Sequence, residues 1–393
     1  MKKKTQCIII ILTLLLIIDG CNTFNNTTKR TIVEKDDITS NNLYKKGYHS
    51  LLKKADIALT STYKSVVDKS LIPPSGDKHD YYSTAVYYWE NPNTKNGLPW
   101  IYKDGEYNGP ALKKTDHSNY YKVMEAIRDL ALAYEYTLEN KYAQKSIALT
   151  KQWFISDSTK MNPNLNYAQG IPGLTDGYAS GIIDSRAILW VIDSIPILKE
   201  SNNWNEQIEI EFKTWCSKYL DWLLTSEFGK KEAKSKNNHG TFYDLQVATF
   251  ATFVGNNKLA INTIENTKRI RIELQIKPDG SMPEELKRTR AFKYSLFNLS
   301  AYFELAMLSD NFGIDLWNYK NEKCGSVKDA FDFVLNNAIF NDNWKYEGKV
   351  EKDQIIGLLH IATKFIDNSY SIPRDKLLEE KSFEKISDIY FVQ

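Results

Sequence analysis

The chain has 393 residues, of which 42% are hydrophobic and 13% aromatic, so it can bury a large core as one big domain or two modest ones. Its 51 basic and 49 acidic residues give a formal net charge of +2, which argues against a nucleic-acid partner. The 24 tyrosines and 9 tryptophans supply surface that suits a sugar-binding groove and equally suits ordinary packing. Strand-like alternation is scarce, and the bias is towards helix.

The N-terminus has the pattern of a secretory signal, which we predict over residues 1–20. Three lysines precede an apolar run from Cys7 to Ile18 that is too short for a comfortable membrane span. The junction before Cys21 resembles a bacterial lipoprotein cleavage site, which would leave Cys21 lipidated at the mature N-terminus. Asp19 is unusual inside such a site, and a plain signal peptide cut nearby is the alternative. We therefore expect an exported protein, a periplasmic or outer-membrane lipoprotein whose lipid makes the membrane a partner.

Residues 21–42 are rich in Asn, Thr, Lys and Asp, and we predict a flexible tether there. Helical periodicity begins near residue 43 and breaks at residues 71–76. Further helices are predicted over 119–139, 141–155, 181–199, 204–226, 243–254, 258–273, 292–311, 326–337, 354–367 and 374–386. So many amphipathic helices without βαβ alternation predict helices packed on helices. The expected fold class is all-α, an incomplete (α/α) toroid of antiparallel hairpins that occupies residues 43–393.

Between the first two predicted helices, residues 77–115 form a long irregular segment dense in aromatic residues. A loop of this length is uncommon in a compact domain and is usually functional. A second notable stretch runs from Asn237 to Gln246, where polar residues precede an apolar helical pattern. Gly240 gives its backbone freedom, and Thr241 is the expected N-cap, with Asp244 three residues on. The alternative interpretation is a capped helix start that carries a stray histidine.

Four stretches together resemble the alginate lyase family of helical-toroid polysaccharide lyases, over roughly residues 76–317. The central stretch Asn237–Asp244 matches the family's signature, and residues 283–289 with Tyr294 match the segment that brings an arginine and a tyrosine to the active site. Residues 162–169 with 181–184 resemble the family's middle motif. Residues 78–83, 88–92, 97–100 and 104–108 follow its aromatic loop, although Tyr88 and Glu90 stand where the family often has Trp and Pro.

The resemblance implies β-elimination on alginate or a related polyuronate, with an anionic polysaccharide as the partner. Such a lyase removes the C5 proton of a uronate and expels the oxygen at C4. Asn238 and Arg288 would neutralise the substrate carboxylate, and Tyr294 would act as acid and base. His239 would be either a neutraliser or the second base. Because Arg288 and Tyr294 are six residues apart, we expect Arg288 in the loop and Tyr294 in the following helix.

Each of these residues also has an ordinary structural interpretation. On that interpretation Tyr294 is a packing tyrosine on one helix face, and Arg288 belongs to a solvated run of charged residues. Arg290, in the same run, is the alternative residue for the role of Arg288. Substrate contacts by stacking or hydrogen bonding are expected from a further set of residues. These are Lys78, His79, Tyr81, Trp89, Tyr167, Gln169 and Asn237.

Two other functions remain open at this stage. A hydrolase would need two carboxylic acids that flank the scissile bond, and Asp184, Asp244 and Glu284 are candidates without a forced partner. A glycan-binding lipoprotein would keep the aromatic groove without the chemistry. We expect no cofactor and no metal site, since the chain has no His-x-x-x-His pair, Cys cluster or EF-hand loop.

Overall fold

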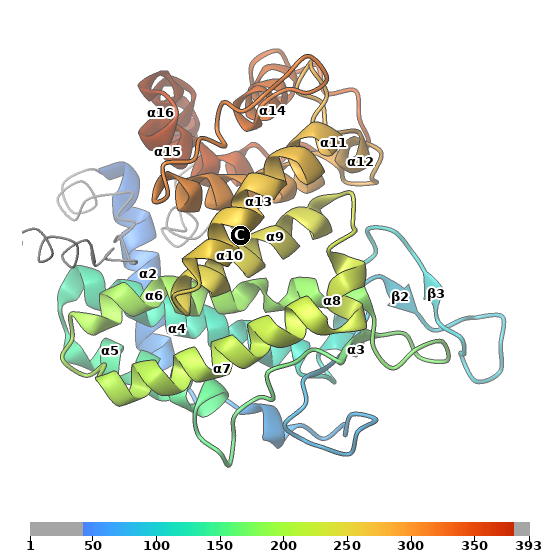
Figure 1. Ribbon diagram of the computed structural model, residues 1–393, viewed down its shortest axis with the longest axis vertical. Helices are drawn as coiled ribbons and strands as arrows, with labels where there is room; N and C mark the ends of the chain where they lie inside the picture. The colour runs from blue at the N-terminus through green and yellow to red at the C-terminus, as the bar shows by residue number, and fades with distance from the viewer. Residues whose placement is uncertain (1–41, 381–393) are drawn as a thin grey trace, which may run out of the picture.

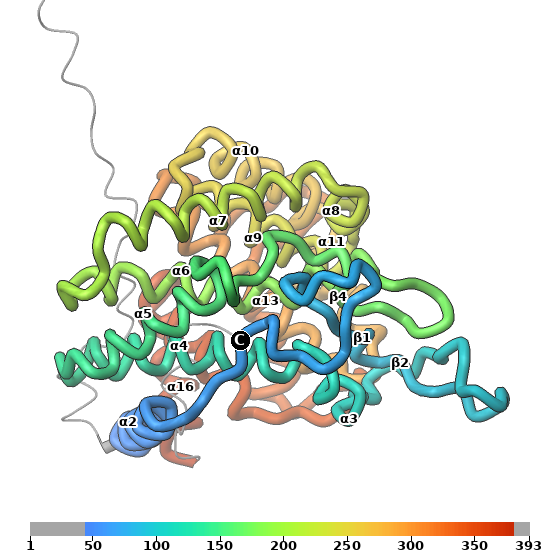
Figure 2. Tube along the Cα trace, turned by 90° about the horizontal axis from the view of Figure 1, so that it is seen from below, coloured from blue at the N-terminus to red at the C-terminus, as the bar shows by residue number. Residues whose placement is uncertain are grey.

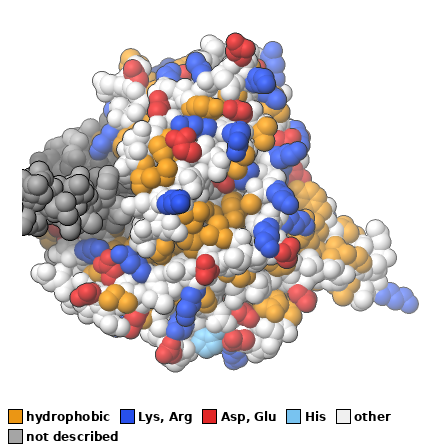
Figure 3. Space-filling model, viewed as in Figure 1, with side chains coloured by type: hydrophobic (Ala, Val, Ile, Leu, Met, Phe, Trp, Pro, Cys, Tyr) orange, Lys and Arg blue, Asp and Glu red, His pale blue; other side chains and the backbone are white. Residues whose placement is uncertain are grey.

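A computed structural model describes residues 42–380 (Figure 1). The predicted signal peptide, Cys21 and all but the last residue of the predicted tether lie outside the described residues, as does the end of the last predicted helix. Within the described range no helix is long and apolar enough to cross a membrane. Figure 3 shows acidic and basic side chains intermixed over one face, as the near-zero net charge predicts.

The described chain is mainly helical, as the sequence predicts. Its α-helices are α2 (Asn42–Thr60), α3 (Gly109–Leu112), α4 (His117–Thr137), α5 (Asn140–Phe154), α6 (Arg186–Lys199), α7 (Glu206–Thr225), α8 (Glu227–Glu232), α9 (Asn238–Phe253), α10 (Asn257–Thr267), α11 (Glu273–Gln275), α12 (Pro283–Leu286), α13 (Ala291–Asp310), α14 (Val327–Val334), α15 (Ile356–Phe365) and α16 (Ser371–Glu380). Short 3₁₀ segments cover Val66–Asp68, Ala179–Ser185, Lys352–Ile355 and Asn368–Tyr370, and π-helical segments cover Lys268–Ile272 and Leu335–Phe340.

The helices pack on one another in succession around a shared core. Helix α4 packs against α2, α5 and α6, while α9 packs against α6, α7, α10 and α13. Helices α4, α9 and α13 are buried on nearly all sides, and helices such as α7 cover them with one apolar face. This arrangement is the incomplete (α/α) toroid that the sequence predicts.

Helix α7 shows how the outer helices are specified. Its buried residues recur at three- and four-residue spacing, so a single apolar stripe faces the core. Asn205 caps its N-terminus, where the side-chain oxygen accepts a hydrogen bond from the amide of Ile208 at 3.0 Å. The stripe residues are Ile208, Phe212, Trp215, Cys216, Tyr219, Leu220 and Leu223.

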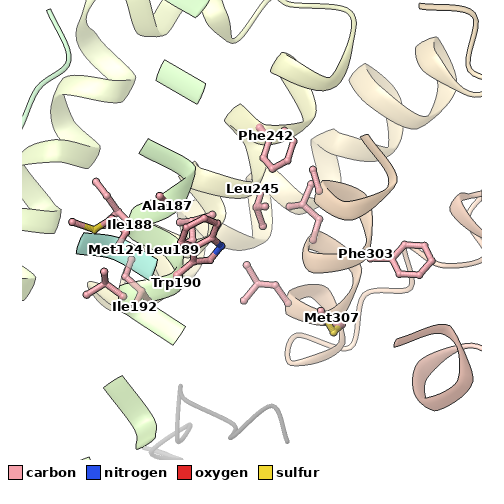
Figure 4. Close-up of a cluster of buried hydrophobic side chains, with 14 of the residues drawn as sticks. Met124, Ala187, Ile188, Leu189, Trp190, Ile192, Phe242, Leu245, Phe303 and Met307 are labelled. Carbon is pink, nitrogen blue, oxygen red and sulfur yellow. The ribbon is translucent and has the colours of Figure 1, made fainter. Parts of the chain in front are cut away.

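The hydrophobic core is one connected cluster that draws residues from α2 through α16. Figure 4 shows a part of it, in which Leu245 of α9 lies between the α4–α6 side chains around Trp190 and the α13 side chains around Phe303. The two cysteines of the described range, Cys216 and Cys324, are buried free thiols. The core therefore holds together helices that are distant in the sequence. Cys216 and Cys324 do not form a disulfide with each other.

The aromatic segment is more ordered than the sequence indicates. Residues 77–115 contain β1 (Tyr82–Thr84), β2 (Tyr88–Trp89), β3 (Ile101–Tyr102) and helix α3. Strand β1 pairs in parallel with β4 (Tyr167–Gly170), and β2 pairs antiparallel with β3. The β2–β3 hairpin projects from the helical body in both views (Figures 1 and 2). The expectation of an irregular segment without helix was therefore wrong in this respect.

Helix α9 begins at Asn238, five residues before the predicted start, and its N-cap is Asn237 rather than Thr241. The Asn237 side chain accepts a hydrogen bond from the amide of His239 at 3.3 Å. Thr241 is buried inside the first turns, and its hydroxyl donates to Gln275 Oε1 at 3.1 Å. The early start places polar side chains on the first turn of a buried helix, where the core fixes their positions.

Candidate active site

A cavity of about 780 Å³ opens beside the N-terminus of α9. Its walls come from the aromatic segment, the first turns of α4, residues 169–186, the start of α9, and the α12–α13 connection with the first turns of α13. The polar and aromatic lining residues are Tyr87, Tyr88, Tyr102, Tyr107, His117, Ser118, Tyr121, Lys122, Glu125, Gln169, Tyr178, Ser180, Asp184, Arg186, Asn237, Asn238, His239, Arg288, Arg290, Lys293, Tyr294 and Phe297. The four predicted catalytic residues thus meet around one space.

Asn238 is fixed by a buried carboxylate. Glu285 of α12 accepts hydrogen bonds from the Asn238 backbone amide at 2.7 Å and from its side-chain Nδ2 at 2.8 Å. Burial raises the pKa of Glu285, and the two hydrogen bonds from Asn238 oppose the rise. An amide nitrogen carries two hydrogens, so the contact with Glu285 uses only one of those on Nδ2. The side chain is therefore held in one orientation while it keeps a donor for a ligand.

His239 is oriented by Glu232, the last residue of α8. The distance from His239 Nδ1 to Glu232 Oε1 is 2.6 Å, and the Glu232 side chain is almost fully buried. Burial alone would lower the pKa of His239, but the charge of Glu232 and the hydrogen bond to it outweigh burial, so the pKa lies above its usual value. Because Nδ1 faces Glu232, Nε2 is the ring nitrogen left to react.

A buried ion pair holds this part of the chain in place. Arg271 binds both oxygens of Asp244 on α9 and donates to the backbone oxygens of Ala233 and Ser235 at 2.8 and 2.9 Å. The link ties the segment that follows Glu232 to α9. Gly240 makes room for it, because a Cβ there would lie 2.2 Å from Ser235 O and 2.7 Å from Arg271 Nη1.

Arg288 and Tyr294 form a stacked pair where the α12–α13 connection leads into α13. Arg288 follows α12 and Tyr294 lies in α13, as the six-residue spacing predicts. The guanidinium carbon lies 3.7 Å from the centroid of the Tyr294 ring. Asp104 of the aromatic segment binds the same guanidinium at 2.5 Å through Nη2 and 3.3 Å through Nε. Asp104 therefore occupies two of the donors that could hold a carboxylate.

Burial favours the neutral, protonated form of the Tyr294 phenol. Its hydroxyl donates to the hydroxyl of Tyr87 at 2.7 Å. Burial raises the pKa of Tyr294 well above its ordinary value, Tyr87 adds to the rise, and Arg288 opposes it without reversing it. A nearby arginine alone would bring this pKa down, but here burial prevails. The state of Tyr294 suits proton donation rather than proton removal.

Two of the predicted substrate contacts lie in the lining and one lies behind it. Asn237 and Gln169 line the cavity. The Gln169 amide donates to Asp184 at 2.9 Å. Tyr81 does not reach the cavity, because it is buried against Tyr120 and donates its hydroxyl to Asp184 at 3.0 Å. Tyr81 therefore supports the lining instead of forming it.

The other four predicted contacts, Lys78, His79, Trp89 and Tyr167, also lie outside the lining. Lys78 is exposed, and the ring nitrogen Nδ1 of His79 is bound at 2.6 Å to a backbone oxygen. The Trp89 indole donates at 2.9 Å to the backbone oxygen of Glu106, which follows β3. Tyr167 lies in β4, paired with β1. None of these four side chains lines the cavity. His79, Trp89 and Tyr167 have the local structural contacts given above.

Within residues 42–380 no group of three or more His, Cys, Asp or Glu side chains is arranged to hold a metal ion.

A model of the alginate lyase family matches residues 65–344, which is well over half of the chain. The chain belongs to the alginate lyase family. It is accordingly a polysaccharide lyase, and the helical fold described above is the fold of its solved relatives.

Solved structures of alginate lyases resemble this family member to different degrees. An alginate lyase from Bacteroides ovatus is 33% identical with a TM-score of 0.84, over 91% of this chain and 96% of that chain. Alginate lyase A1-III from Sphingomonas species A1 is 13% identical with a TM-score of 0.51, over 81% and 89% of the two chains. A variant of A1-III complexed with a tetrasaccharide is 13% identical with the same TM-score, over 82% and 91%. A comparison with curated protein sequences finds no match.

Arg186 is a cavity residue of this alginate lyase family member that the sequence analysis missed. It is the first residue of α6, and its guanidinium lies 5.0 Å from the Tyr121 ring and 5.2 Å from the Phe297 ring. Its Nε is buried without a hydrogen-bond partner in the described part of the chain. The only sign of it in the sequence was its position two residues after Asp184, where the middle motif ends.

The charges around the lyase's cavity favour an anionic ligand. Five lysine and arginine side chains line it against two carboxylates. One of the carboxylates, Asp184, accepts hydrogen bonds from Tyr81, Ser83 and Gln169 and is turned towards these partners. The five basic residues are Lys122, Arg186, Arg288, Arg290 and Lys293. Such an excess attracts a chain that carries a carboxylate on each sugar.

Proposed function

We propose that this lyase cleaves alginate, or a related 1,4-linked polyuronate, by β-elimination in the cavity beside α9. The observation that carries the proposal is the meeting of Asn238, His239, Arg288 and Tyr294, from three separate segments, around one basic cavity. A base takes the C5 proton of a bound uronate, the C5–H electrons form the C4–C5 double bond, and the C4–O bond breaks. An acid protonates the departing oxygen. The new end is an unsaturated uronate.

The C5 proton is only weakly acidic, because the adjacent carboxylate is already negative. Asn238 and Arg288 are assigned to that carboxylate, where their N–H groups stabilise the charge that builds up on it. Glu285 holds Asn238 in place, and the stacking on Tyr294 holds Arg288. Loss of one such prearranged donor typically costs about 2.7–4 kcal/mol of transition-state stabilisation.

His239 is assigned as the base and Tyr294 as the acid. Glu232 fixes the Nδ1 hydrogen of His239, so Nε2 is free to take a proton, and the same carboxylate makes the ring more basic. Tyr294 keeps its proton, because its pKa is raised, and can pass it to the leaving oxygen. With His239 and Tyr294 as separate groups, the C5 proton can be removed on one face of the sugar ring while the leaving oxygen is protonated on the other face. This suits the uronate epimer whose C5–H and C4–O bonds are anti.

The test is incubation of the purified chain with polymannuronate, polyguluronate and glucuronan in turn, followed by ultraviolet absorbance of the C4–C5 double bond. We expect a rise on at least one polymer that Tyr294→Phe reduces by about 10²-fold or more. Tyr346→Phe, at an exposed tyrosine outside the cavity, is the matched control and should match the unaltered chain. New reducing ends without absorbance would contradict elimination.

The hydrolase alternative lacks a pair of available acids. Asp184 is held by three hydrogen-bond donors, and Asp244 is buried in its ion pair with Arg271 at 2.9 Å. Glu284 lies outside the cavity lining and pairs with Lys287 at 2.6 Å. None of the three is placed to face a second acid across a scissile bond.

We also propose that the protein is exported and anchored by a lipid on Cys21. The support is the basic, apolar and small-residue pattern of residues 1–21 alone. Expression in a bacterium with a labelled fatty acid tests it. Label on the full chain that disappears in Cys21→Ser supports the anchor, and a soluble unlabelled product from both chains contradicts it.

A further inference from the structure

A second and larger cavity, of about 1040 Å³, lies on the other side of the first turns of α4. Its walls come from the end of α2, residues 61–71, residues 113–116 and α4 itself. In Figure 2 the blue segment that follows α2 passes close to α4 before it reaches β1, and the Asn119 side chain of α4 donates to Lys64 O at 2.9 Å. We call this space the α2–α4 cavity. None of the four catalytic residues lines it.

The two cavities share a wall. Ser118, Lys122 and Glu125 line both of them. These residues are spaced by four and three positions on α4, so they form one stripe along the helix. A polymer that leaves the active-site cavity across this stripe enters the α2–α4 cavity directly. The wall itself carries an exposed lysine, Lys122, which can meet a carboxylate at the crossing.

The α2–α4 cavity carries an excess of unpaired positive charge. Two of its carboxylates are bound within the protein, Asp116 to Lys69 at 2.5 Å and Asp129 to Arg128 at 3.0 Å. A third, Asp68, accepts hydrogen bonds from the Ser65 amide and hydroxyl. With Glu125 as the remaining acid, five exposed lysines outweigh the acids that are left. They are Lys54, Lys64, Lys113, Lys114 and Lys122.

A buried donor adds a second, independent observation. Arg128 lines the α2–α4 cavity although its side chain is only 2% exposed. Its Nη1 atom has no hydrogen-bond partner within residues 42–380, while Nε and Nη2 bind Asp129. An unpaired buried guanidinium nitrogen is costly unless a ligand or water accepts from it. The cavity therefore has a lysine rim, and its lining includes one buried guanidinium whose Nη1 is unpaired. The same guanidinium lies 4.9 Å from the centroid of the Trp190 ring.

We infer that the α2–α4 cavity binds the same polyuronate chain beyond the reacting sugars. The inference rests on the function proposed above. A 1,4-linked uronate chain carries one carboxylate per sugar, so a chain that crosses α4 brings successive carboxylates to the lysine rim. Each exposed ion contact is weak, and the gain comes from several contacts on one tethered chain. The cavity then favours long polymers over short oligosaccharides.

The test compares Lys113→Glu/Lys114→Glu with the unaltered chain on the preferred polymer and on a trisaccharide of the same uronate. We expect KM for the polymer to rise about 5- to 10-fold at low salt. The rise should shrink at about 0.5 M salt, because exposed charges are screened there. The trisaccharide should show no such change, because a short ligand seated in the active-site cavity does not extend across α4.

Two further variant pairs complete the design. Lys218→Glu/Lys258→Glu reverses two exposed lysines on α7 and α10 that line neither cavity, and it should behave as the unaltered chain. Lys54→Glu/Lys64→Glu reaches the α2–α4 cavity from another wall and should repeat the effect. An unchanged polymer KM in both cavity pairs, or an equal rise on polymer and trisaccharide, would overturn the inference. Absence of unsaturated product from the unaltered chain would instead overturn the proposed function.

Discussion

Glu232 and Glu285 hold two side chains that line the cavity, but they do not line it themselves. Each is buried and each binds one residue of the start of α9, His239 or Asn238. They are positioning residues, since neither residue lines the cavity in which we propose that the uronate binds. Their removal should therefore change the properties of the residue they hold rather than the shape of the cavity.

Substitution of Glu232 by Gln should change the pH profile of the lyase. Glu232 raises the pKa of His239, so the base is protonated, and inactive, up to a pH above its usual 6.5. In Glu232→Gln that pKa falls, and the acidic limb of kcat/KM should move to lower pH. The plateau rate should fall by about 10-fold or more, because a weaker base removes the C5 proton more slowly.

The measurement is kcat/KM on the preferred polymer across the pH range. On the alkaline side the plateau should extend past pH 10 in both chains, because Tyr294 keeps its proton there. Glu284→Gln removes an exposed carboxylate outside the cavity and serves as the control. A profile that keeps its acidic limb in Glu232→Gln would rule out His239 as the base.

For single residues, the sequence identifies candidate site residues best where several polar residues follow one another. Asn238, His239 and Arg288 stand in polar stretches that mark a site. The direction of an aromatic side chain is not encoded in such a stretch, so Trp89 was assigned to the groove although it lies outside the cavity lining. Arg186 was missed because it stands alone at the start of an apolar helix, where only the tertiary contacts with two aromatic rings reveal it.

Among the elements, the β2–β3 hairpin is joined to the α12–α13 connection by a charged contact. Asp104, just after β3, binds Arg288 with both oxygens and also accepts from the Thr289 amide and hydroxyl. The hydrogen bond from Arg288 holds the pKa of Asp104 well below its ordinary value of 3.8. A lowered pKa means that this contact stabilises the fold above pH 3.8 and is lost only as the pH falls through the lower folded value.

The variant Asp104→Asn should loosen the hairpin. Loss of a partly buried charged hydrogen bond costs about 1.5–3 kcal/mol, so amide hydrogen exchange in β2 and β3 should become about 10- to 150-fold faster. Exchange in α9 and α13 should stay as it is. Asp157→Asn, which breaks the exposed pair with Lys160, is the matched control and should leave the hairpin unchanged. Equal exchange in all three chains would show that Asp104 does not hold the hairpin.

Element types were predictable because most helices carry a clear three- and four-residue periodicity. The start of α9 was not, since polar residues that face an active site break that periodicity even though they are helical. The π-helical segments at Lys268–Ile272 and Leu335–Phe340 were also not predicted, because their sequences continue the pattern of the helices that precede them.

At the scale of the whole molecule, the stability of the fold depends on a core that lies outside the cavity lining. Phe303 of α13 is fully buried between Trp317 and Phe331, with ring centroids 5.0 and 5.1 Å away. Phe303→Ala should lower the free energy of unfolding by about 3–5 kcal/mol through the cavity it leaves. The kcat measured well below the unfolding temperature should stay within a few-fold, because Phe303 lies outside the cavity lining.

Chemical denaturation measures this change, and Phe340→Ala is its control. Phe340 is 55% exposed, so its removal should cost no more than about 0.5 kcal/mol. A small effect of Phe303→Ala would mean that the core around α13 adapts to the loss. The mainly helical architecture was predictable from composition and periodicity. The cavity was not, because it depends on the packing of α4, α9 and α13, which periodicity does not specify.

The two walls of the active-site cavity differ in how they are built. The wall with Asn238, His239 and Tyr294 belongs to buried helices, so a substitution there disturbs folding and chemistry together. The opposite wall comes from a projecting hairpin and its neighbouring loops, where most side chains are half-buried or exposed. We therefore expect substitutions in the hairpin to be tolerated more readily than substitutions in α9 or α13. On that expectation, an exchanged hairpin can alter which polymer the cavity accepts while Asn238, His239 and Tyr294 are retained.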